Sequence, residues 1–187
     1  MAIYYYHDRQ TKKSLSFLRR QESNLVIMST KPKIHLASDH AGFEYKEILK
    51  SFLTNEGYEV IDHGPATYDK DDDYPDFIAP LAKAISESNG QDKVYPELVE
   101  RGIILGFSGQ GEAIVANRFK GVRAAVYYGG NEEILKLSRE HNDSNVLSLA
   151  AGFISKEELA PVVSLWIKTP FSNEERHIRR IKKLNVV

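Results

Sequence analysis

A glycine-rich loop is the segment of this chain whose residues are best suited to chemistry. It reads GFSGQGEAIVANR over residues 106–118, and Glu112 directly follows two glycines that flank Gln110. A carboxylate in the first turn of a helix is favoured by the helix dipole, which should keep it ionised, as a general base requires. The backbone N–H groups from Ser108 to Gly111 could stabilise an oxyanion on a substrate. Together these groups favour proton abstraction beside a carbonyl group.

The same loop also has a structural and a nucleotide-binding interpretation. Gly109 and Gly111 could simply permit a tight strand-to-helix turn, and Glu112 could be a favourable first-turn residue without a chemical role. A nucleotide site is disfavoured, because the loop lacks both the lysine of a phosphate-binding loop and the third glycine of the dinucleotide fingerprint.

Two further polar clusters lie next to predicted strands. The segment SDHAGF has Asp39 and His40 at the end of a strand, where Asp39 could also cap the following helix. The segment SREHNDSNV has His141 and Asn142 between a helix and a strand, a position typical of capping and turn residues. Each cluster therefore has a structural interpretation beside the catalytic one.

The C-terminal segment EERHIRRIKK is rich in arginine. Arg176 and Arg180 are four residues apart, so they project from the same face of a helix. This face is either solvated or forms a clamp for a phosphate group, which two adjacent guanidinium groups bind well.

Short apolar runs that alternate with amphipathic stretches define the elements that must position these groups. We expect strands at 33–38, 58–64, 102–107, 122–128 and 145–151. We expect helices at 42–57, from Pro75 to residue 88, and at 112–119. Successive strand-then-helix units predict an α/β fold, a parallel sheet with helices on both faces. Ligands bind beyond the carboxyl ends of such strands, so Asp39, His40 and the glycine-rich loop should meet at one crevice.

The composition suits an ordinary globular domain. The chain has 187 residues, of which 42% are hydrophobic, and a formal net charge of −1, which offers no nucleic-acid footprint. Cysteine is absent, which excludes disulfides, thiolate catalysis and cysteine-based metal sites. No apolar run is long enough to span a membrane and no secretory signal is apparent, so a cytoplasmic location fits.

The N-terminal segment has a different charge from the rest of the chain. Residues 1–32 carry six Lys and Arg against two acidic residues, a balance of +4, and show no convincing helical or strand period. We expect residues 1–31 to be a basic extension outside the fold and residues 32–187 to form one domain. The extension could instead be an interaction arm, a targeting peptide or the product of an upstream start, since Met28 opens a natural beginning for the first strand.

Six motifs in the same order and spacing give the chain a resemblance to a known family. From Lys33 to Ile181 it resembles the type B ribose-5-phosphate isomerases and their galactose-6-phosphate isomerase relatives. The motifs are SDHAGFEYKE, DDDYPDF, SGQGEAIVANR, GVRAAV, SREHNDSNVL and RHIRRI. The resemblance implies a Rossmann-like, five-stranded parallel sheet with helices on both faces. It also implies an aldose–ketose isomerase of a sugar phosphate that needs no metal and no cofactor.

The family has two versions of the catalytic base. One version uses a cysteine at the end of the strand before the glycine-rich loop, and the other uses a glutamate within the loop. This chain has Gly106 at the cysteine position and Glu112 at the glutamate position, so it resembles the glutamate version.

The resemblance implies a role for each candidate residue. Glu112 would move the proton through a cis-enediolate, Asp39 would assist, and His141 would help to open the sugar ring. The enediolate oxygen and the sugar would be held by Ser108, Gly109, Gly111 and Asn142. The phosphate would be bound by His40, Arg176 and Arg180.

The family also implies how the site is assembled. It lies between two subunits, with the arginines and His141 supplied by the partner chain, so a homodimer or a dimer of dimers is expected. The expected partner molecule is a sugar phosphate, and neither nucleic acid nor a membrane is expected.

One departure from the family leaves the substrate open. Family members usually carry an arginine shortly after the strand NVLSL, and here the corresponding residue is Gly152. Ribose 5-phosphate is the expected substrate. The alternatives are galactose 6-phosphate, allose 6-phosphate or a tetrose phosphate, and a catalytically silent binding subunit. Retention of Asp39, Glu112 and His141 speaks against silence. The connection at 89–100 is longer than usual and has no assigned role.

Overall fold

The computed structural model describes residues 31–89 and 100–184, and the domain they form contains one parallel sheet of five strands. The strand order is β2-β1-β3-β5-β4. The strands are β1 (Lys33–Ser38), β2 (Val60–Asp62), β3 (Glu100–Gly106), β4 (Ala124–Tyr127) and β5 (Val146–Ala150). The prediction for residues 1–31 and the 89–100 connection fall almost entirely outside the described residues.

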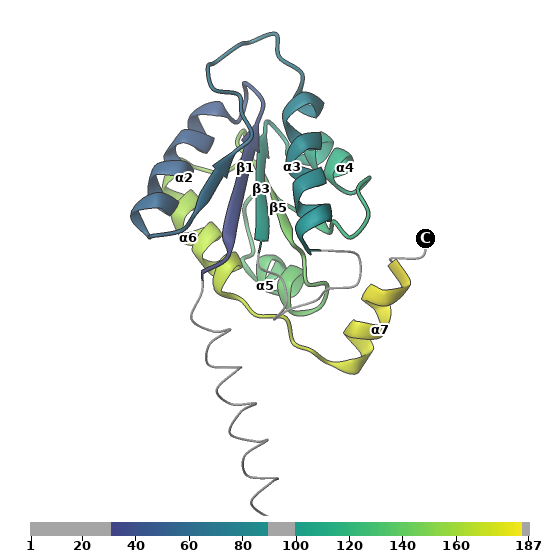
Figure 1. Cartoon of the computed structure of the whole chain (residues 1–187). Coiled ribbons are helices and arrows are strands. Elements are labelled where there is room, and N and C mark those ends of the chain that lie inside the picture. The colour runs from purple at the N-terminus through teal and green to yellow at the C-terminus, as the bar shows by residue number, and fades with distance from the viewer. Residues whose placement is uncertain (1–30, 90–99, 185–187) are drawn as a thin grey trace, which may run out of the picture. The chain divides into compact units, whose positions relative to one another are not determined.

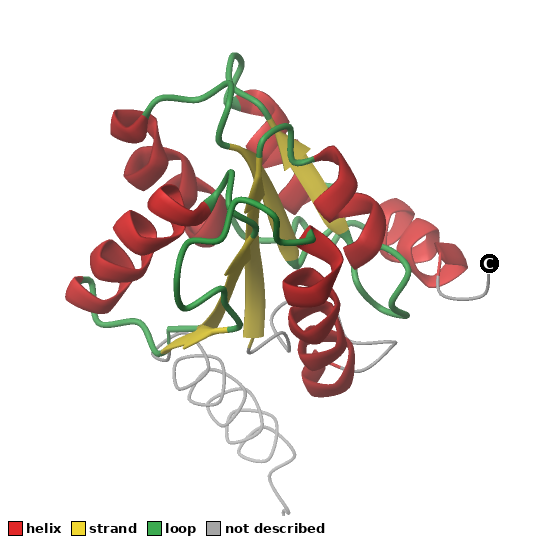
Figure 2. Cartoon of the chain, turned by 90° about the horizontal axis from the view of Figure 1, so that it is seen from above, coloured by secondary structure: helices red, strands yellow, loops and turns green. Residues whose placement is uncertain are grey.

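Helices cover both faces of the sheet, as Figures 1 and 2 show. One face packs against α2 (Phe43–Asn55), α5 (Glu133–Glu140) and α6 (Lys156–Lys168). The other face packs against α3 (Tyr74–Asn89) and α4 (Gln110–Ala116). The predicted α/β class, a Rossmann-like parallel sheet between two helical layers, is confirmed.

The central strands align the loops that carry the candidate residues. β1 pairs with β3 so that Ser38 lies opposite Leu105, and β3 pairs with β5 so that Gly106 lies opposite Ala150. These strands are almost entirely buried because both faces are covered, which explains their continuous apolar runs. Consequently, the segments that follow β1, β3 and β5 leave the sheet side by side.

Two elements depart from their expected bounds. The strand expected at 58–64 is reduced to three residues, since Tyr58 instead donates its backbone N–H to Leu53 at the end of α2. The helix expected at 112–119 begins two residues earlier and ends at Ala116. Glu112 therefore lies inside the first turn and not at its start.

The last helix, α7 (Glu175–Leu184), follows an extended segment that leaves α6. In Figure 1 it lies at the same end of the sheet as α5, away from the carboxyl ends of the strands. Among the described residues, no helix combines the length and the apolar character that crossing a bilayer requires.

Candidate active site

Asp39 directly follows β1 and contacts the end of β3, the strand that leads into the glycine-rich loop. Its backbone N–H donates to the carbonyl of Leu105 in β3 at 3.4 Å, and its side chain is 7% exposed. The carboxylate also accepts the backbone N–H of Gly42 at 3.1 Å, so it does stabilise the turn before α2. The structural and the catalytic interpretation of Asp39 are therefore compatible, because only one of its oxygens is needed for the turn.

The Glu112 carboxylate lies directly over Gly106, the last residue of β3. A methyl group at position 106 would lie 1.8 Å from Oε1 and 2.2 Å from Cδ of Glu112, closer than any real contact. Glu112 is only 4% exposed although its side chain is ionisable. The absence of a side chain at Gly106 thus creates the space in which the carboxylate lies.

Burial raises the pKa of Glu112 above the ordinary value of a glutamate. The negative charge of Asp39 adds to the rise, while a hydrogen bond from the backbone N–H of Glu112 itself opposes it. The helix dipole, which we expect to favour the ionised form, is therefore opposed by desolvation, which outweighs the favourable backbone contact. A raised pKa makes the carboxylate a stronger base near neutral pH.

The backbone of the glycine-rich loop turns sharply before α4. Gly109 has φ of +70°, a left-handed conformation that favours glycine, and its carbonyl accepts the Ser148 hydroxyl at 2.6 Å. A side chain at Gly111 would meet the ring of Tyr74 at 2.9 Å. The Gln110 backbone N–H already donates to the Ser108 hydroxyl at 3.3 Å. The tight-turn interpretation of both glycines is thus supported, and it does not conflict with a role in binding.

His40 is held by an aspartate that the sequence did not single out. The Oδ1 atom of Asp72 accepts the backbone N–H of His40 at 3.0 Å and lies 2.7 Å from its Nδ1 atom. The hydrogen bond to Asp72 raises the pKa of His40, and the nearby charge of Asp39 contributes. Asp72 comes from the acidic loop DDDYP, 32 residues further along the chain, so the acidic run was the only sequence signal.

We predict that Asp72→Asn weakens phosphate binding through His40. The Asp72 partner raises the folded-state pKa of His40, so the positive charge persists to higher pH in the parent than in the variant. The KM for a sugar phosphate should rise roughly tenfold at neutral pH, on the scale of 1–2 kcal/mol for a lost charged partner, with a smaller change in kcat. A KM-against-pH profile should show the parent retaining low KM to higher pH. The matched control is Asp71→Asn, an exposed neighbour in the same loop, and equal profiles for the two variants would contradict the assignment.

His141 and Asn142 lie at the opposite end of the sheet from Glu112. They follow α5 and precede β5, whose first residue pairs with Gly102, whereas Gly106 pairs with its last residue. The positions of Gly102 and Gly106 are four residues apart along β3, which is about 13 Å at the rise of a parallel strand. One chain therefore does not bring His141 to its own Glu112.

The His141 ring is packed against a second histidine that the sequence analysis passed over. The ring centroids of His141 and His177 are 4.3 Å apart. His177, in α7, is buried, and its Nδ1 atom lies 2.8 Å from the Ser172 hydroxyl. Burial lowers the pKa of His177, and His141 adds to the effect. The motif RHIRRI contained this residue, but its spacing from His141 gave no sign of the contact.

The two C-terminal arginines are exposed near this histidine pair. Arg176 forms an ion pair with Glu174, with 2.7 Å between Nε and Oε2, and Arg180 lies one turn further along α7. Because His141 and α7 are in contact, the structure gathers the predicted phosphate-binding arginines with the predicted ring-opening histidine.

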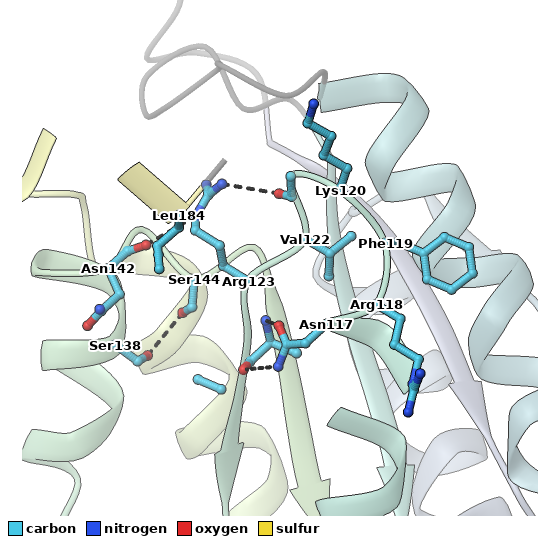
Figure 3. Close-up of a pocket in the computed structure, with 13 residues that line it drawn as sticks. Asn117, Arg118, Phe119, Lys120, Val122, Arg123, Ser138, Asn142, Ser144 and Leu184 are labelled. Atoms are coloured by element: carbon cyan, nitrogen blue, oxygen red, sulfur yellow. Dashed lines mark hydrogen bonds between the residues drawn. The ribbon is translucent and has the colours of Figure 1, made fainter. Parts of the chain in front are cut away.

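A cavity of about 620 Å³ lies beside Asn142 rather than beside Glu112. Figure 3 shows its lining, which includes Arg118, Lys120, Arg123 and Leu184. It opens between the C-terminal ends of α4 and α5, at the amino end of β4. Glu112 does not line this cavity.

Comparison with known proteins identifies the family. Residues 34–184 match the ribose/galactose isomerase family. The chain belongs to this family. It is 36% identical over 150 residues to ribose-5-phosphate isomerase B of Mycolicibacterium paratuberculosis, covering 80% of this chain and 87% of the relative.

Solved structures of this family have the same fold. Ribose-5-phosphate isomerase B of Mycoplasma genitalium with bound ribulose 5-phosphate gives a TM-score of 0.74 at 33% identity, covering 82% of this chain and 94% of that one. The enzyme from Thermotoga maritima gives a TM-score of 0.73 at 36% identity, covering 84% and 100%. The similarity thus extends over essentially the whole described domain.

Gly152, where this family usually has an arginine, is covered by an aromatic ring. A side chain at Gly152 would meet the ring of Phe107 at 2.6 Å. Phe107 and Phe153 lie in edge contact with centroids 5.6 Å apart, and they are 63% and 61% exposed. An apolar pair therefore lies between the ends of β3 and β5, at the position where the resemblance implies an arginine.

A metal site was not expected, and the described residues contain no group of three or more histidine, aspartate and glutamate side chains that could hold a metal ion.

Proposed function

We propose that this protein is a ribose-5-phosphate isomerase that interconverts ribose 5-phosphate and ribulose 5-phosphate. The relatives named for this activity cover the same domain at 33–36% identity. The observation that carries the proposal is the Glu112 carboxylate, buried over Gly106 and beside Asp39. A family of sugar isomerases needs a base in this position, and a binding protein does not.

The reaction moves one carbon-bound proton. His141 helps to open the furanose ring to the free aldehyde. Glu112 removes the proton from C2 to give a cis-enediolate and returns it to C1, while a hydroxyl proton passes from O2 to O1 with help from Asp39. C1 is reduced and C2 is oxidised within one molecule, so the balance requires no cofactor and no metal. Backbone N–H groups of Ser108, Gly109 and Gly111 hold the enediolate oxygen.

The remaining groups bind the sugar and its phosphate. The Ser108 hydroxyl and Asn142 position the sugar. The phosphate is bound by His40, whose pKa is raised by Asp72, and by Arg176 and Arg180. These assignments follow the family motifs, and the contact of His40 with Asp72, which raises the pKa of His40, supports one of them.

The active site is shared between two subunits of a homodimer, or of a dimer of dimers. The separation of His141 from Glu112 within one chain, about 13 Å along the sheet, supports this arrangement. Exposed apolar side chains next to the site, including Phe107 and Ile114, are also typical of a surface that a partner covers.

Mixing two inactive variants tests the shared site. Glu112→Gln and His141→Ala dimers should each be inactive, but a hybrid dimer carries one intact site made of the unaltered residues of both chains. Refolding the two together should restore about a quarter of the parental activity if subunits combine randomly in a two-fold dimer. No recovery in a mixture whose hybrid dimers are verified by differential tagging would refute the shared site.

An isomerase assay over a panel of sugar phosphates tests the proposed reaction. Ribose 5-phosphate should be the preferred substrate over galactose 6-phosphate, allose 6-phosphate and erythrose 4-phosphate. Preference for one of the other sugar phosphates would retain the proposed isomerisation and change only the substrate. The apolar pair of Phe107 and Phe153 is the specific reason to test this alternative. Binding of sugar phosphates with no turnover of any would instead establish a silent binding subunit.

A further inference from the structure

The turn that carries His141 and Asn142 is bound by buried charged side chains. Asp143, the next residue, is completely buried and has φ of +45°, an uncommon conformation for a residue other than glycine. The backbone N–H of Asp143 donates to Arg139 and that of Ser144 to Ser138, both at 2.9 Å. These bonds close the turn and hold the N–H of the peptide between Asn142 and Asp143, while the carbonyl oxygen of that peptide is bound by another group.

Arg123 contacts the carbonyl of that peptide and the carbonyl of the next one along the chain. Its Nε atom donates to the carbonyl of Asn142 at 3.1 Å and to that of Asp143 at 2.9 Å. Its Nη2 atom donates to the Asp143 carboxylate at 3.1 Å, and its Nη1 atom to the carbonyl of Gly121 at 3.1 Å. Figure 3 shows Arg123 reaching from the segment before β4 toward Asn142. One guanidinium group thus joins the start of β4 to the His141–Asn142 turn.

A second arginine completes the arrangement from the other side. Arg139 donates from Nη1 to the other oxygen of the Asp143 carboxylate at 2.8 Å, and its side chain is completely buried. Two guanidinium groups therefore fix one carboxylate in the interior of the domain. Burying such charges is costly, and apolar residues of similar size often stabilise a protein as well or better. The arrangement is therefore poorly explained by stability alone.

The geometry of a guanidinium group is well suited to holding a backbone segment in one position. It offers donors in a rigid plane, so Arg123 can hold two carbonyls and a carboxylate at the same time. A lysine ammonium at the same position is a single point of contact and cannot hold the three groups in one plane. The side chains of His141 and Asn142 then project from a fixed backbone, with the His141 ring further confined by His177.

We propose that Arg123 is a positioning residue for His141 and Asn142, acting through the peptide between Asn142 and Asp143. This rests on the proposed function, in which His141 opens the sugar ring. It gives a role to the segment GVRAAV, which the proposed chemistry leaves unused. Loss of the contact should impair ring opening much more than proton transfer at C1, because His141 acts in ring opening, whereas the proton at C1 is moved by Glu112 of the other subunit.

Two measurements separate these steps. Net conversion of ribose 5-phosphate needs ring opening, since this aldose is mostly a closed furanose. Incorporation of solvent deuterium at C1 of ribulose 5-phosphate does not, because O5 carries the phosphate and the ketose stays open. In that exchange Glu112 takes a proton from C1, exchanges it with solvent and returns a deuteron to C1.

Arg123→Lys is the first variant. Its initial rate of ribose 5-phosphate conversion should fall by about 10- to 100-fold, the scale of a misplaced catalytic group, while C1 exchange falls less than about threefold. Asp143→Asn should shift the ratio of the two rates in the same direction, and it decides the question if Arg123→Lys does not fold. The matched control is Arg101→Lys, another buried arginine, whose guanidinium group donates to the carbonyl of Ile167 and lies over the ring of Trp166.

The outcomes are distinct. A parent protein that neither converts ribose 5-phosphate nor exchanges the C1 proton would refute the proposed function itself. A parent with both activities, combined with variants that lose both by the same factor, or neither, would refute the positioning role and leave the proposed function standing. Arg101→Lys should lower the melting temperature and leave the ratio of the two rates unchanged.

Discussion

Glu112→Gln should reduce kcat by about 10²- to 10⁴-fold, the usual contribution of a general base, with little change in KM. Glutamine has nearly the size of glutamate, so its side chain can still fill the space over Gly106. The amide cannot accept the carbon-bound proton, and both isomerisation and deuterium exchange at C1 should be lost together. Steady-state kinetics and the exchange assay measure the two effects independently.

The same variant should be more stable than the parent at neutral pH. The pKa of Glu112 is higher in the folded state than in the unfolded state. The stability that the protonated carboxyl group contributes is therefore fully present below the unfolded-state pKa of about 4.3, and it is lost as the pH rises through the folded-state pKa. Glutamine has no charge to desolvate. The difference in melting temperature between Glu112→Gln and the parent should therefore be small in acid and grow as the pH rises toward neutrality.

Glu157→Gln is the control for this prediction. Glu157 is also an acidic residue in a first helical turn, that of α6, but it is exposed. Its substitution should change neither kcat nor the pH dependence of the melting temperature. If Glu112→Gln instead keeps near-parental turnover on the preferred substrate, Glu112 is not the base.

The fold was predictable because its central strands are buried on both faces. The run KIHLAS predicted β1 with its observed bounds, and the strand expected at 102–107 matches β3, Glu100–Gly106, to within two residues at each end. The edge strand β2 was overestimated. It pairs only with β1, and the flanking residues Glu59, His63 and Gly64 each make a single backbone hydrogen bond to β1 outside the regular strand.

The site was only partly predictable, since its decisive contacts join residues far apart in the chain. Spacing could assign Glu112 to a first helical turn, but its burial depends on the path of β3 beneath it. The contacts of His40 with Asp72 and of His141 with His177 span 32 and 36 residues of the numbering. No local pattern encodes such pairs, which form when a loop or a terminal helix folds back onto the domain.

Gly106→Ala should be nearly as damaging to catalysis as loss of the base. The added methyl group would lie 1.8 Å from Oε1 of Glu112, so the buried carboxylate must move by more than an ångström. A misplacement of that size can reduce kcat by about 10²-fold or more. Overpacking should also lower the stability by about 1–3 kcal/mol. The double variant Gly106→Ala/Glu112→Gln should be no less active than Glu112→Gln alone, because both changes act through one carboxylate.

Gly102→Ala separates crowding from misplacement of the base. Gly102 lies four residues earlier on β3, on the same face, and a methyl group there would meet Cδ2 of Leu81 at 2.8 Å. It should lower the melting temperature by a similar amount and leave kcat nearly unchanged. A Gly106→Ala protein with parental kcat would mean that the carboxylate is not needed where it lies.

If kcat falls as expected, a side chain at position 106 and a glutamate base at position 112 exclude one another in this chain. A cysteine at position 106 could then act only if the glutamate were replaced, in agreement with the two alternative versions of the base that the resemblance implies.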